Sequence, residues 1–243
     1  MSESKRADVL LVERGHFESR ARARAAIEAG LVSADGAPVS KPAALLRGDA
    51  VLEASAPHPF VSRGGVKLAA ALTAFGFDPA GRACLDIGAS TGGFSHVLLL
   101  RGARKVLAVD VGRGQLHQRL ADEPRLVSLE GQDIRTLDAA MVGEPPTLVV
   151  IDVSFISLAA VLPAATRLAA ARALLVALVK PQFEVGRAHI KKGVVRDMAA
   201  QQEGCLRIEE ALRDLGWTVV GHMPSPILGG DGNRESLIGA RRG

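Results

Sequence analysis

The chain has 243 residues, of which 48% are hydrophobic and 23% are charged, so it can bury a core, and a wholly disordered chain is excluded. Its two cysteines, Cys84 and Cys205, lie far apart, which excludes a disulfide framework and favours a reducing, cytoplasmic location without a bound metal. The formal net charge of +4 is a weak indication of a polyanionic partner.

The N-terminal segment MSESKRADVLLVERG has no long apolar stretch and no cleavage site, so we expect no signal peptide. The most apolar segment, Leu158–Val179, contains Pro163, Arg167 and Arg172. Each central charge costs ~2.5–3.5 kcal/mol in a membrane-spanning helix. We therefore expect a helix followed by a strand, and no stable association with membranes.

The N-terminal part of the chain has the pattern of a small α+β domain. Ser19 is a good N-cap for a helix over 20–29, and Gly30 can end that helix in a left-handed conformation. The segment LVSADGAPV predicts two strands joined by an Asp35-Gly36 turn, and GDAVLEA predicts a third strand.

Two prolines in SAPHPF, residues 55–60, indicate a linker after this module. We therefore expect an N-terminal domain over 1–56, a linker over 57–62 and a larger domain over 63–243.

Helical and strand-like segments alternate through the larger domain, starting with a helix in KLAAALTAF. The alternation predicts a doubly wound α/β sheet in which the last two strands form an antiparallel edge. The strand-like runs are ACLDIG, KVLAVDV, RLVSLEG, TLVVIDVS, ALLVALVK, WTVVGHM and ESLIGA.

A glycine-rich loop, IGASTGG, joins the first of these strands to a helix. Its glycines are spaced G-x-x-x-G-G, which differs from the dinucleotide fingerprint, and no P-loop lysine follows. A strand, a glycine loop and a helix in this order form a ligand site in α/β sheets, although a tight turn without a ligand is the alternative. Asp86, at the end of the strand, could accept a hydrogen bond from a cationic amino group.

Two more acids follow the next two strands. Asp110 lies about 20 residues beyond Gly88, where a carboxylate can bind both hydroxyls of a ribose, and capping of a helix is the alternative. Asp133, in LEGQDIR, could meet an adenine amino group. Acids instead of a phosphate cradle favour an adenosine ligand that carries a cation, and S-adenosylmethionine fits that description.

Four further ionisable residues lie at the ends of segments. Asp152 ends the fourth strand and Lys180 the fifth, and strands consecutive in sequence are usually neighbours. Lys67 begins the first helix, and Glu235 enters the last strand. Helix capping by Asp152 and solvent exposure of Lys180 are the alternatives, and the sequence alone does not show that the four converge.

Several stretches, in order, closely resemble the TlyA family, also labelled hemolysin A. They are SRGGVKL, DIGASTGGFS, AVDVGRGQL, VSFISL, KPQFEVG and GVVRD. The larger domain is similar to FtsJ-type ribose methyltransferases, and the segment from SRARARAAIEAGLV to RGDAV resembles an S4 RNA-binding domain. The resemblance runs from about residue 6 to residue 239. It implies a Rossmann-like, seven-stranded methyltransferase sheet and S-adenosylmethionine-dependent 2′-O-methylation of cytidine in bacterial ribosomal RNA.

The resemblance also implies which residues act. Its Lys-Asp-Lys-Glu catalytic set matches Lys67, Asp152, Lys180 and Glu235. With the acids named above, the expected cofactor residues are Asp86, Gly88, Ala89, Ser90, Gly92, Gly93, Phe94, Asp110, Asp133 and Asp152. We expect Lys180 to orient or deprotonate the 2′-hydroxyl and Asp152 to orient Lys180. Lys67 would steady the developing oxyanion, and Glu235 would anchor Lys67 or the ribose.

The expected partner is ribosomal RNA or a ribosomal subunit. The chain ends four residues after Gly239, which favours large-subunit 23S RNA alone over both subunits, with small-subunit 16S RNA as a second option. One departure from the family is PHPF in the linker, where a bulkier tetrapeptide is expected, and it leaves the coupling of RNA docking to cofactor binding open. The sequence does not fix the oligomeric state, and a monomer is compatible with it.

Basic residues are expected to contact RNA phosphates, which fixes the register without reading the sequence. A solvated helix face is the alternative for each arginine taken singly. Aromatic residues are scarce, so recognition by shape is favoured over base stacking. The expected contacts are Arg6, Arg20, Arg22, Arg24, Lys41, Arg63, Arg187, Lys191, Lys192 and Arg196.

Two other functions compete with the enzyme. One is an RNA-binding protein with an inactive methyltransferase domain, and the complete Lys-Asp-Lys-Glu set argues against it. The other is a membrane-active hemolysin, and the absence of an apolar span or a strongly amphipathic cationic helix argues against that.

Overall fold

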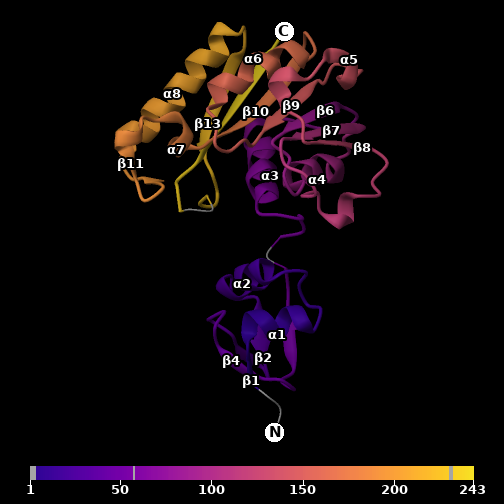
Figure 1. The fold of residues 1–243 in the computed structure, drawn as a ribbon, viewed down its shortest axis with the longest axis vertical. Helices are drawn as coiled ribbons and strands as arrows, with labels where there is room; N and C mark the ends of the chain where they lie inside the picture. The colour runs from indigo at the N-terminus through magenta and orange to yellow at the C-terminus, as the bar shows by residue number, and fades with distance from the viewer. Residues whose placement is uncertain (1–3, 57, 230–231) are drawn as a thin grey trace. The chain divides into compact units, whose positions relative to one another are not determined.

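The computed structural model describes residues 4–56, 58–229 and 232–243, drawn as a ribbon in Figure 1. Contacts divide the chain into two compact units, Met1–Pro59 and Phe60–Gly243. Position 57, where the expected linker begins, lies outside the described residues. The domain limits expected at residues 56 and 63 stay predictions.

The first unit is a small α+β module. The Ser19 side chain accepts a hydrogen bond from the main-chain N–H of Arg22 and so caps the second helix. Asp35 and Gly36 have φ of 50° and 77°, the conformation that a two-residue hairpin turn requires. Its elements are β1 (Ser4–Arg6), α1 (Ala7–Glu13), α2 (Arg20–Glu28), β2 (Val32–Ala34), β3 (Ala37–Pro38), β4 (Leu45–Arg47) and β5 (Leu52–Ala54).

The strands β2, β3 and β5 form the expected antiparallel sheet, in the order β3-β2-β5. Three elements of this unit, β1, α1 and β4, were not predicted. Strands β1 and β4 pair with one another across the module. Each has only three residues, so neither is long enough to show a period-2 pattern. The buried core combines both helices with the sheet, through Leu11, Ala23, Ile27 and Val32.

The second unit contains the predicted doubly wound sheet, which confirms the expected fold class. Its helices are α3 (Gly64–Phe75), α4 (Gly93–Leu100), α5 (Ala139–Val142), α6 (Leu158–Leu168), α7 (Pro181–Glu184) and α8 (Met198–Asp214), with short 3-10 turns η1 (Gln118–Leu120), η2 (Ile134–Thr136) and η3 (Arg187–His189). Its strands are β6 (Ala83–Ile87), β7 (Lys105–Asp110), β8 (Leu126–Glu130), β9 (Leu148–Ile151), β10 (Ala173–Val179), β11 (Ile190–Lys191), β12 (Val194–Val195), β13 (Thr218–Pro224) and β14 (Ser236–Arg242).

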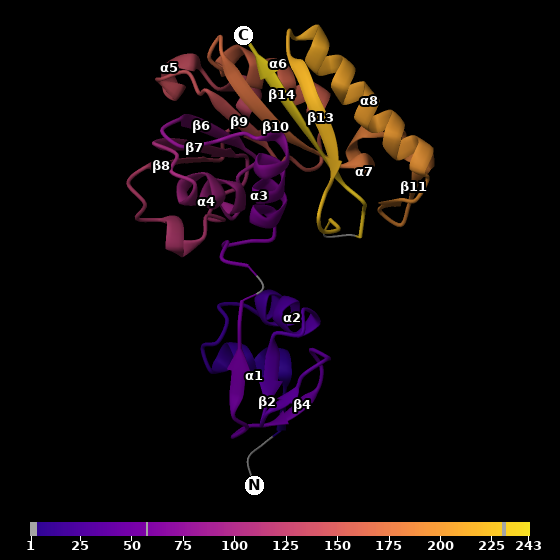
Figure 2. The same cartoon turned by 180° about the vertical axis from the view of Figure 1, so that it is seen from behind.

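The main sheet has the strand order β13-β14-β10-β9-β6-β7-β8. Strands β8, β7, β6, β9 and β10 are mutually parallel. The last two strands pair antiparallel, as expected, and β14 inserts antiparallel between β13 and β10. Figure 2, in which the chain is seen from behind, shows β13 and β14 next to one another.

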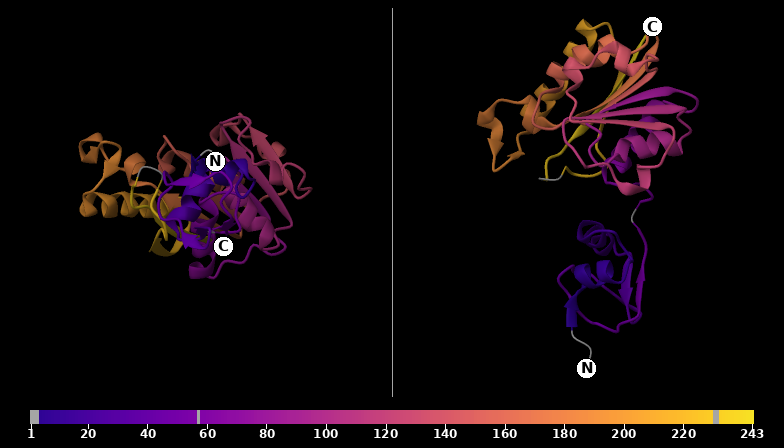
Figure 3. Two further views of the ribbon diagram at one scale, coloured as in Figure 1. Left: turned by 90° about the horizontal axis from the view of Figure 1, so that it is seen from below. Right: turned by 45° about the vertical axis from the view of Figure 1, so that its right-hand side comes forward.

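Side chains of the central strands alternate between two cores. In β9, Val149 and Ile151 join a core with residues of α6 and α8, while Leu148 and Val150 join one with residues of α3 and α4. Both cores are apolar, so the strands are buried on both faces, as a parallel sheet between helices requires. The right-hand view of Figure 3 shows helices on either side of the sheet.

This topology places the site. Strand β6 has β7 on one side and β9 on the other, so the connections after these strands run to opposite sides and leave a crevice at their carboxyl ends. Within the described ranges, no helix is both long and apolar enough to cross a membrane.

Candidate active site

Two adjoining hollows open at the carboxyl ends of β6, β7, β9 and β10. The larger, of about 600 Å³, is lined by Asp110 and Asp133 among others. The smaller, of about 190 Å³, is lined by Lys67 and Lys180. The hollows share the linings Gly88, Ser90, Asp152 and Ser154, so they meet at the glycine loop and the end of β9.

The glycine loop turns tightly beneath the end of β9. Gly88 has φ of +82°, and a Cβ there would overlap the main-chain oxygen of Asp152. Gly92 has φ of +86° and precedes α4 as its N-cap. Only glycine satisfies both demands at position 88, because other residues would add strain and a clash. The loop therefore brings its main chain to the boundary between the two hollows.

Main-chain donors hold the carboxylates of β7 and β8. Asp110 accepts hydrogen bonds from the N–H groups of Ser90 (2.8 Å) and Gly112 (2.7 Å). Glu130 accepts three, from Gly114, Gln115 and Leu116, and these lower its pKa. The loop after β7 is thereby fixed against the glycine loop as one wall of the larger hollow.

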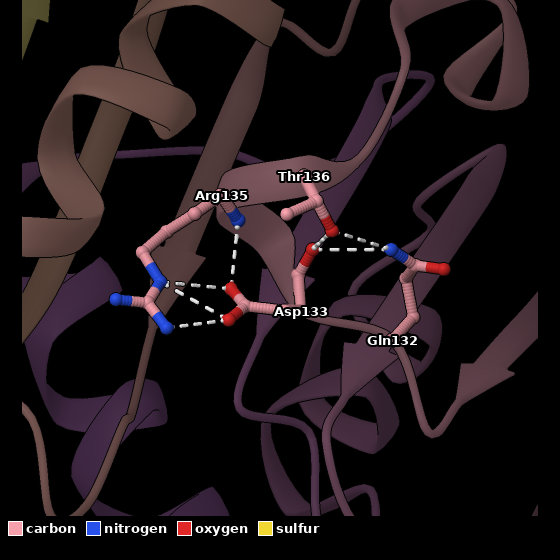
Figure 4. A network of polar contacts seen from close by, with 4 residues as sticks. All are labelled: Gln132, Asp133, Arg135 and Thr136. Carbon is pink, nitrogen blue, oxygen red and sulfur yellow. Dashed lines mark hydrogen bonds and ion pairs between the residues drawn. The ribbon is translucent and has the colours of Figure 1, made fainter.

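Asp133 is held by a neighbouring arginine (Figure 4). Its Oδ2 lies 2.6 Å from Nη2 of Arg135, and its Oδ1 accepts from the main-chain N–H of Arg135 at 2.9 Å. These hydrogen bonds lower the pKa of Asp133. The amide of Gln132 donates to the main-chain oxygen of Asp133 and to the hydroxyl of Thr136. An adenine amino group would therefore share the Asp133 carboxylate with Arg135.

Asp86 is completely buried beneath the glycine loop. Its Oδ2 accepts a hydrogen bond of 2.6 Å from the hydroxyl of Ser95, while Oδ1 has no partner among the described residues. Burial raises the pKa of Asp86 to about 7, and the charges of Asp152 and Asp110 contribute in the same direction. Asp86 lines neither hollow, so its expected contact with an amino group has no support in the geometry.

The amine of Lys180 lies between two groups at the end of β9. Its Nζ lies 2.6 Å from Oδ1 of Asp152, close enough for an ion pair although not aligned as a hydrogen bond. The same Nζ donates to Oγ of Ser154 at 2.7 Å. The side chains of Lys180 and Asp152 are 11% and 20% exposed, so a substrate can reach them.

Lys67 and Glu235 form a second ion pair, which is more deeply buried. The Nζ of Lys67 donates to Oε2 of Glu235, and the side chains are 10% and 3% exposed. Lys67 lines the smaller hollow together with Asp152 and Lys180, whereas Glu235 lies behind Lys67. The four residues of the expected catalytic set are thus joined as two ion pairs, three of them around one hollow.

The remaining predicted cofactor residues divide. Ala89, Gly93 and Phe94 line the smaller hollow, and Gly92 lines neither. The larger hollow is also lined by four residues that were not predicted from the sequence, Ser154, Gln115, Arg135 and Phe155. Ser154 had a local signal, since it follows Asp152 by two residues at the end of a strand. Arg135 lies in η2, and Gln115 and Phe155 lie in loops that follow β7 and β9.

Several expected RNA contacts of the first unit are organised by one acid. The buried carboxylate of Asp8 binds the guanidinium groups of Arg6 (3.0 Å) and Arg20 (2.8 Å), both of which stay largely exposed. These ion pairs and hydrogen bonds lower the pKa of Asp8 to about 2. Arg22 lies 3.9 Å from Glu18, while Arg24 and Lys41 are exposed.

The expected RNA contacts of the second unit occupy two places. Arg63 donates to the main-chain oxygen of Leu228. A basic hairpin, which we define as residues 187–196 around β11 and β12, carries the others. Its exposed cations are Arg187, Lys191, Lys192 and Arg196.

This arrangement can do one kind of chemistry well. A partly exposed amine held by a carboxylate can orient or deprotonate a hydroxyl, and a second cation that lines the same hollow can stabilise the developing negative charge. The adjoining larger hollow, with carboxylates at the ends of β7 and β8, has the size of a small-molecule site.

Family models match both parts of the chain. The FtsJ-like methyltransferase model matches residues 60–242, and the S4 domain model matches residues 5–52. The chain is 45% identical to the 16S/23S rRNA (cytidine-2′-O)-methyltransferase TlyA of Mycobacterium tuberculosis, over 99% of this chain and 91% of that protein. It is 37% identical to Hemolysin A of Brachyspira hyodysenteriae, over 96% and 98% of the two chains.

A solved structure from Streptococcus thermophilus, described as a hemolysin, matches with a TM-score of 0.78 and 38% identity, over 100% of this chain and 90% of that one. The two domain models together cover nearly the whole chain, and so does each of the two relatives. The second unit has the seven-stranded, mostly parallel sheet of a methyltransferase fold. The chain therefore belongs to the TlyA family of FtsJ-like methyltransferases with an N-terminal S4 domain.

Proposed function

We propose that this protein transfers a methyl group from S-adenosylmethionine to the ribose 2′-hydroxyl of a cytidine in ribosomal RNA, with 23S RNA favoured as the substrate. One observation carries the proposal: the amine of Lys180 and the carboxylate of Asp152 stand where a nucleoside-sized hollow meets a smaller one. A methyl donor in the first and a hydroxyl in the second would be brought together at that pair.

The larger hollow fits S-adenosylmethionine. Gly88 lets the main chain approach a ligand without a side chain in the way, Asp110 offers oxygen acceptors for ribose hydroxyls, and Asp133 lies where the base would lie. The bound cofactor would supply an electrophilic methyl group. Asp86 does not line this hollow, and it would influence cofactor binding only indirectly, by fixing the position of the glycine-loop main chain above it.

The reacting hydroxyl needs help from the protein because it keeps its proton at neutral pH. We assign Lys180 to orient this hydroxyl through its ammonium form or to take its proton through its neutral form. Asp152 and Ser154 fix the position of the amine, since each contacts Nζ of Lys180. Lys67 would stabilise the developing oxyanion, and Glu235 holds Lys67 in place.

The RNA substrate follows from the S4 domain and from the relatives. The relative from M. tuberculosis is named for both 16S and 23S RNA, and a relative from Campylobacter jejuni for 23S RNA alone. The expected phosphate contacts lie on both units of this chain, and all of them except the half-buried Arg22 are exposed. A protein that modifies ribosomal RNA would work in the cytoplasm, where we place this one.

Transfer of a labelled methyl group to each purified, unmodified ribosomal subunit tests the proposal, followed by nuclease mapping of the labelled nucleotide. We expect label on the ribose of a cytidine in the large subunit. Cofactor binding without transfer to either subunit would contradict the proposal and favour an RNA-binding protein with an inactive methyltransferase domain.

A further inference from the structure

A third hollow, of about 430 Å³, lies apart from the two that form the candidate active site. It is lined by Val195, Arg196 and Gln201 from one side and by Arg234 from the other. The basic hairpin and the first turn of α8 therefore form one wall, and residues 232–234, in the loop that leads to Glu235, form the other.

Asn233 joins these two walls. Its side chain is completely buried, its Oδ1 accepts from the main-chain N–H of Val195 (2.9 Å), and its Nδ2 donates to the main-chain oxygen of Gly193 (2.8 Å). The side-chain amide of Asn233 thus pairs with the main chain of two hairpin residues, as a neighbouring β-strand would. Removing it would leave a buried N–H group unpaired, which costs ~1–3 kcal/mol.

The same loop encloses the carboxylate of Glu235. The main-chain oxygen of Asn233 accepts from the N–H of Gly229 (2.9 Å), which closes the loop on itself. A Cβ at Gly229 would lie 2.5 Å from Oε1 of Glu235, so the loop main chain lies directly against that carboxylate. A displacement of Asn233 would therefore move Glu235, and with it the buried ion pair to Lys67.

The charge of the third hollow indicates its ligand. Arg196 and Arg234 are both exposed, and neither has an ion-pair or hydrogen-bond partner for its guanidinium among the residues that the structure describes. No described acidic residue lines this hollow. Two free guanidinium groups on walls joined by one buried amide are suited to bind a phosphate of an RNA backbone.

We propose that Arg196 and Arg234 form a subsite for a backbone phosphate of the substrate RNA, and that Asn233 couples this subsite to Glu235. The proposal rests on the proposed function and adds to it a contact residue, Arg234, and a positioning residue, Asn233. The hydrogen bonds of Asn233 hold the hairpin and the Glu235 loop together, so the residue that shapes the subsite also fixes the placement of Lys67.

Kinetics of methyl transfer to the unmodified large subunit test the phosphate subsite. Arg234→Gln and Arg196→Gln should each raise KM for the subunit about 5- to 10-fold and leave kcat and cofactor affinity nearly unchanged. Each should also reduce the slope of log affinity against log salt concentration by about 0.7–0.9, the value for one lost phosphate contact. Arg241→Gln is the matched control, because Arg241 is exposed near the opposite end of β14. Unchanged KM and salt slope in both hollow variants, or an equal change in the control, would overturn the subsite.

A second pair of variants tests the coupling. Gln201 donates to the main-chain oxygen of Val195 (2.7 Å) and so holds the hairpin to α8, with no side-chain hydrogen bond to the described residues of the Glu235 loop. Asn233→Ala should lower kcat at least 10-fold and raise KM, whereas Gln201→Ala should raise KM alone. Asn233→Asp keeps the acceptor for Val195 and should recover part of kcat. Cofactor affinity, measured by calorimetry, shows whether each variant is folded.

Equal effects of Asn233→Ala and Gln201→Ala on kcat would overturn the coupling, since Asn233 would then only support the hairpin. If Asn233→Ala does not bind the cofactor, the kcat of Asn233→Asp against that of Gln201→Ala decides in its place. Failure of the wild-type protein to methylate either subunit would contradict the proposed function itself, so the two failures are distinguishable.

Discussion

Lys180 is a charged residue at the end of one of the most apolar strands of the chain. Six residues from Leu174 to Val179 form the inner part of β10, and the main chain then leaves the sheet at Pro181. The amine is held by Asp152 and Ser154 and stays partly exposed to the smaller hollow. A lysine that merely marked the exit to solvent would not be held by a carboxylate and a hydroxyl from the neighbouring strand end.

Asp86 provides a pH dependence that can be measured. Its pKa is about 7 in the folded chain against 3.8 for an ordinary aspartate, so the folded state binds the extra proton between these values. Stability should therefore fall as pH rises from about 4 to 7 and then level off. Relative to Asp86→Asn, the wild-type protein should lose about 3 kcal/mol of unfolding free energy between about pH 5 and pH 8, at about 1.4 kcal/mol per pH unit below 7. Urea denaturation at both pH values checks this, and a difference that does not change with pH would contradict it.

At the scale of single residues, the sequence pattern predicted which side chains end the strands, whereas the contact of Glu235 with Lys67 was expected, as one of two options, only from the family resemblance. Asp152 and Lys180 were expected to be neighbours because their strands are consecutive. Lys67 and Glu235 are 168 positions apart, and only the insertion of β14 beside β10, together with the packing of α3, brings them into contact. The pairing of Asp133 with Arg135 was missed because an exposed carboxylate and an arginine two residues later can adopt many relative orientations, most of them without contact.

The glycine loop between β6 and α4 is the element on which cofactor binding depends. Gly88→Ala would add the strain of a positive φ and a clash with the main-chain oxygen of Asp152, which lies at the boundary of both hollows. We expect cofactor affinity to fall at least about 10-fold. Gly102→Ala is the control, since Gly102 has the same φ of +82° and only ordinary contacts at 3.7 Å. Calorimetry of both variants gives the answer, and an equal loss of affinity would contradict the role of the loop.

In the first unit, β1, α1 and α2 are tied together through Asp8. Asp8→Asn should weaken binding to the large subunit several-fold, because Arg6 and Arg20 lose the charge that holds them in position. Glu13→Gln removes an exposed ion pair with Lys5 and serves as the control. Filter-binding titrations at one fixed salt concentration compare the two. Equal affinities for both variants would show that Arg6 and Arg20 need no such positioning.

Secondary structure was more predictable in the second unit than in the first, for a physical reason. The central strands β6, β7, β9 and β10 are buried on both faces and read as continuous apolar runs. The edge strands β8 and β13 are partly exposed, but each is a separate run between turn signals, so all seven strands were found. Strands β1 and β4 have three residues each and depend on one another for pairing, which no local pattern records. The insertion of β14 between β10 and β13 likewise follows from chain topology and not from local sequence.

At the scale of the whole molecule, the proposed reaction needs RNA binding and methyl transfer, and each of the two units has the features for one of these tasks. The first has the S4 pattern and presents arginines held by an acid, and the second has the methyltransferase sheet with paired ions at its carboxyl edge. The formal net charge is only +4, so attraction to RNA depends on where the cations are clustered. The cations are clustered in the basic hairpin and around Asp8, where Arg6 and Arg20 are held.

The most direct measurement of the central claim is single-turnover methyl transfer to the unmodified large subunit by Lys180→Ala, with cofactor affinity measured on the same preparation. We predict that transfer falls below detection while cofactor affinity stays within a few-fold of the wild-type value. Transfer at a rate near that of the wild-type protein, with the cofactor bound normally, would contradict the assignment of Lys180 to the reacting hydroxyl.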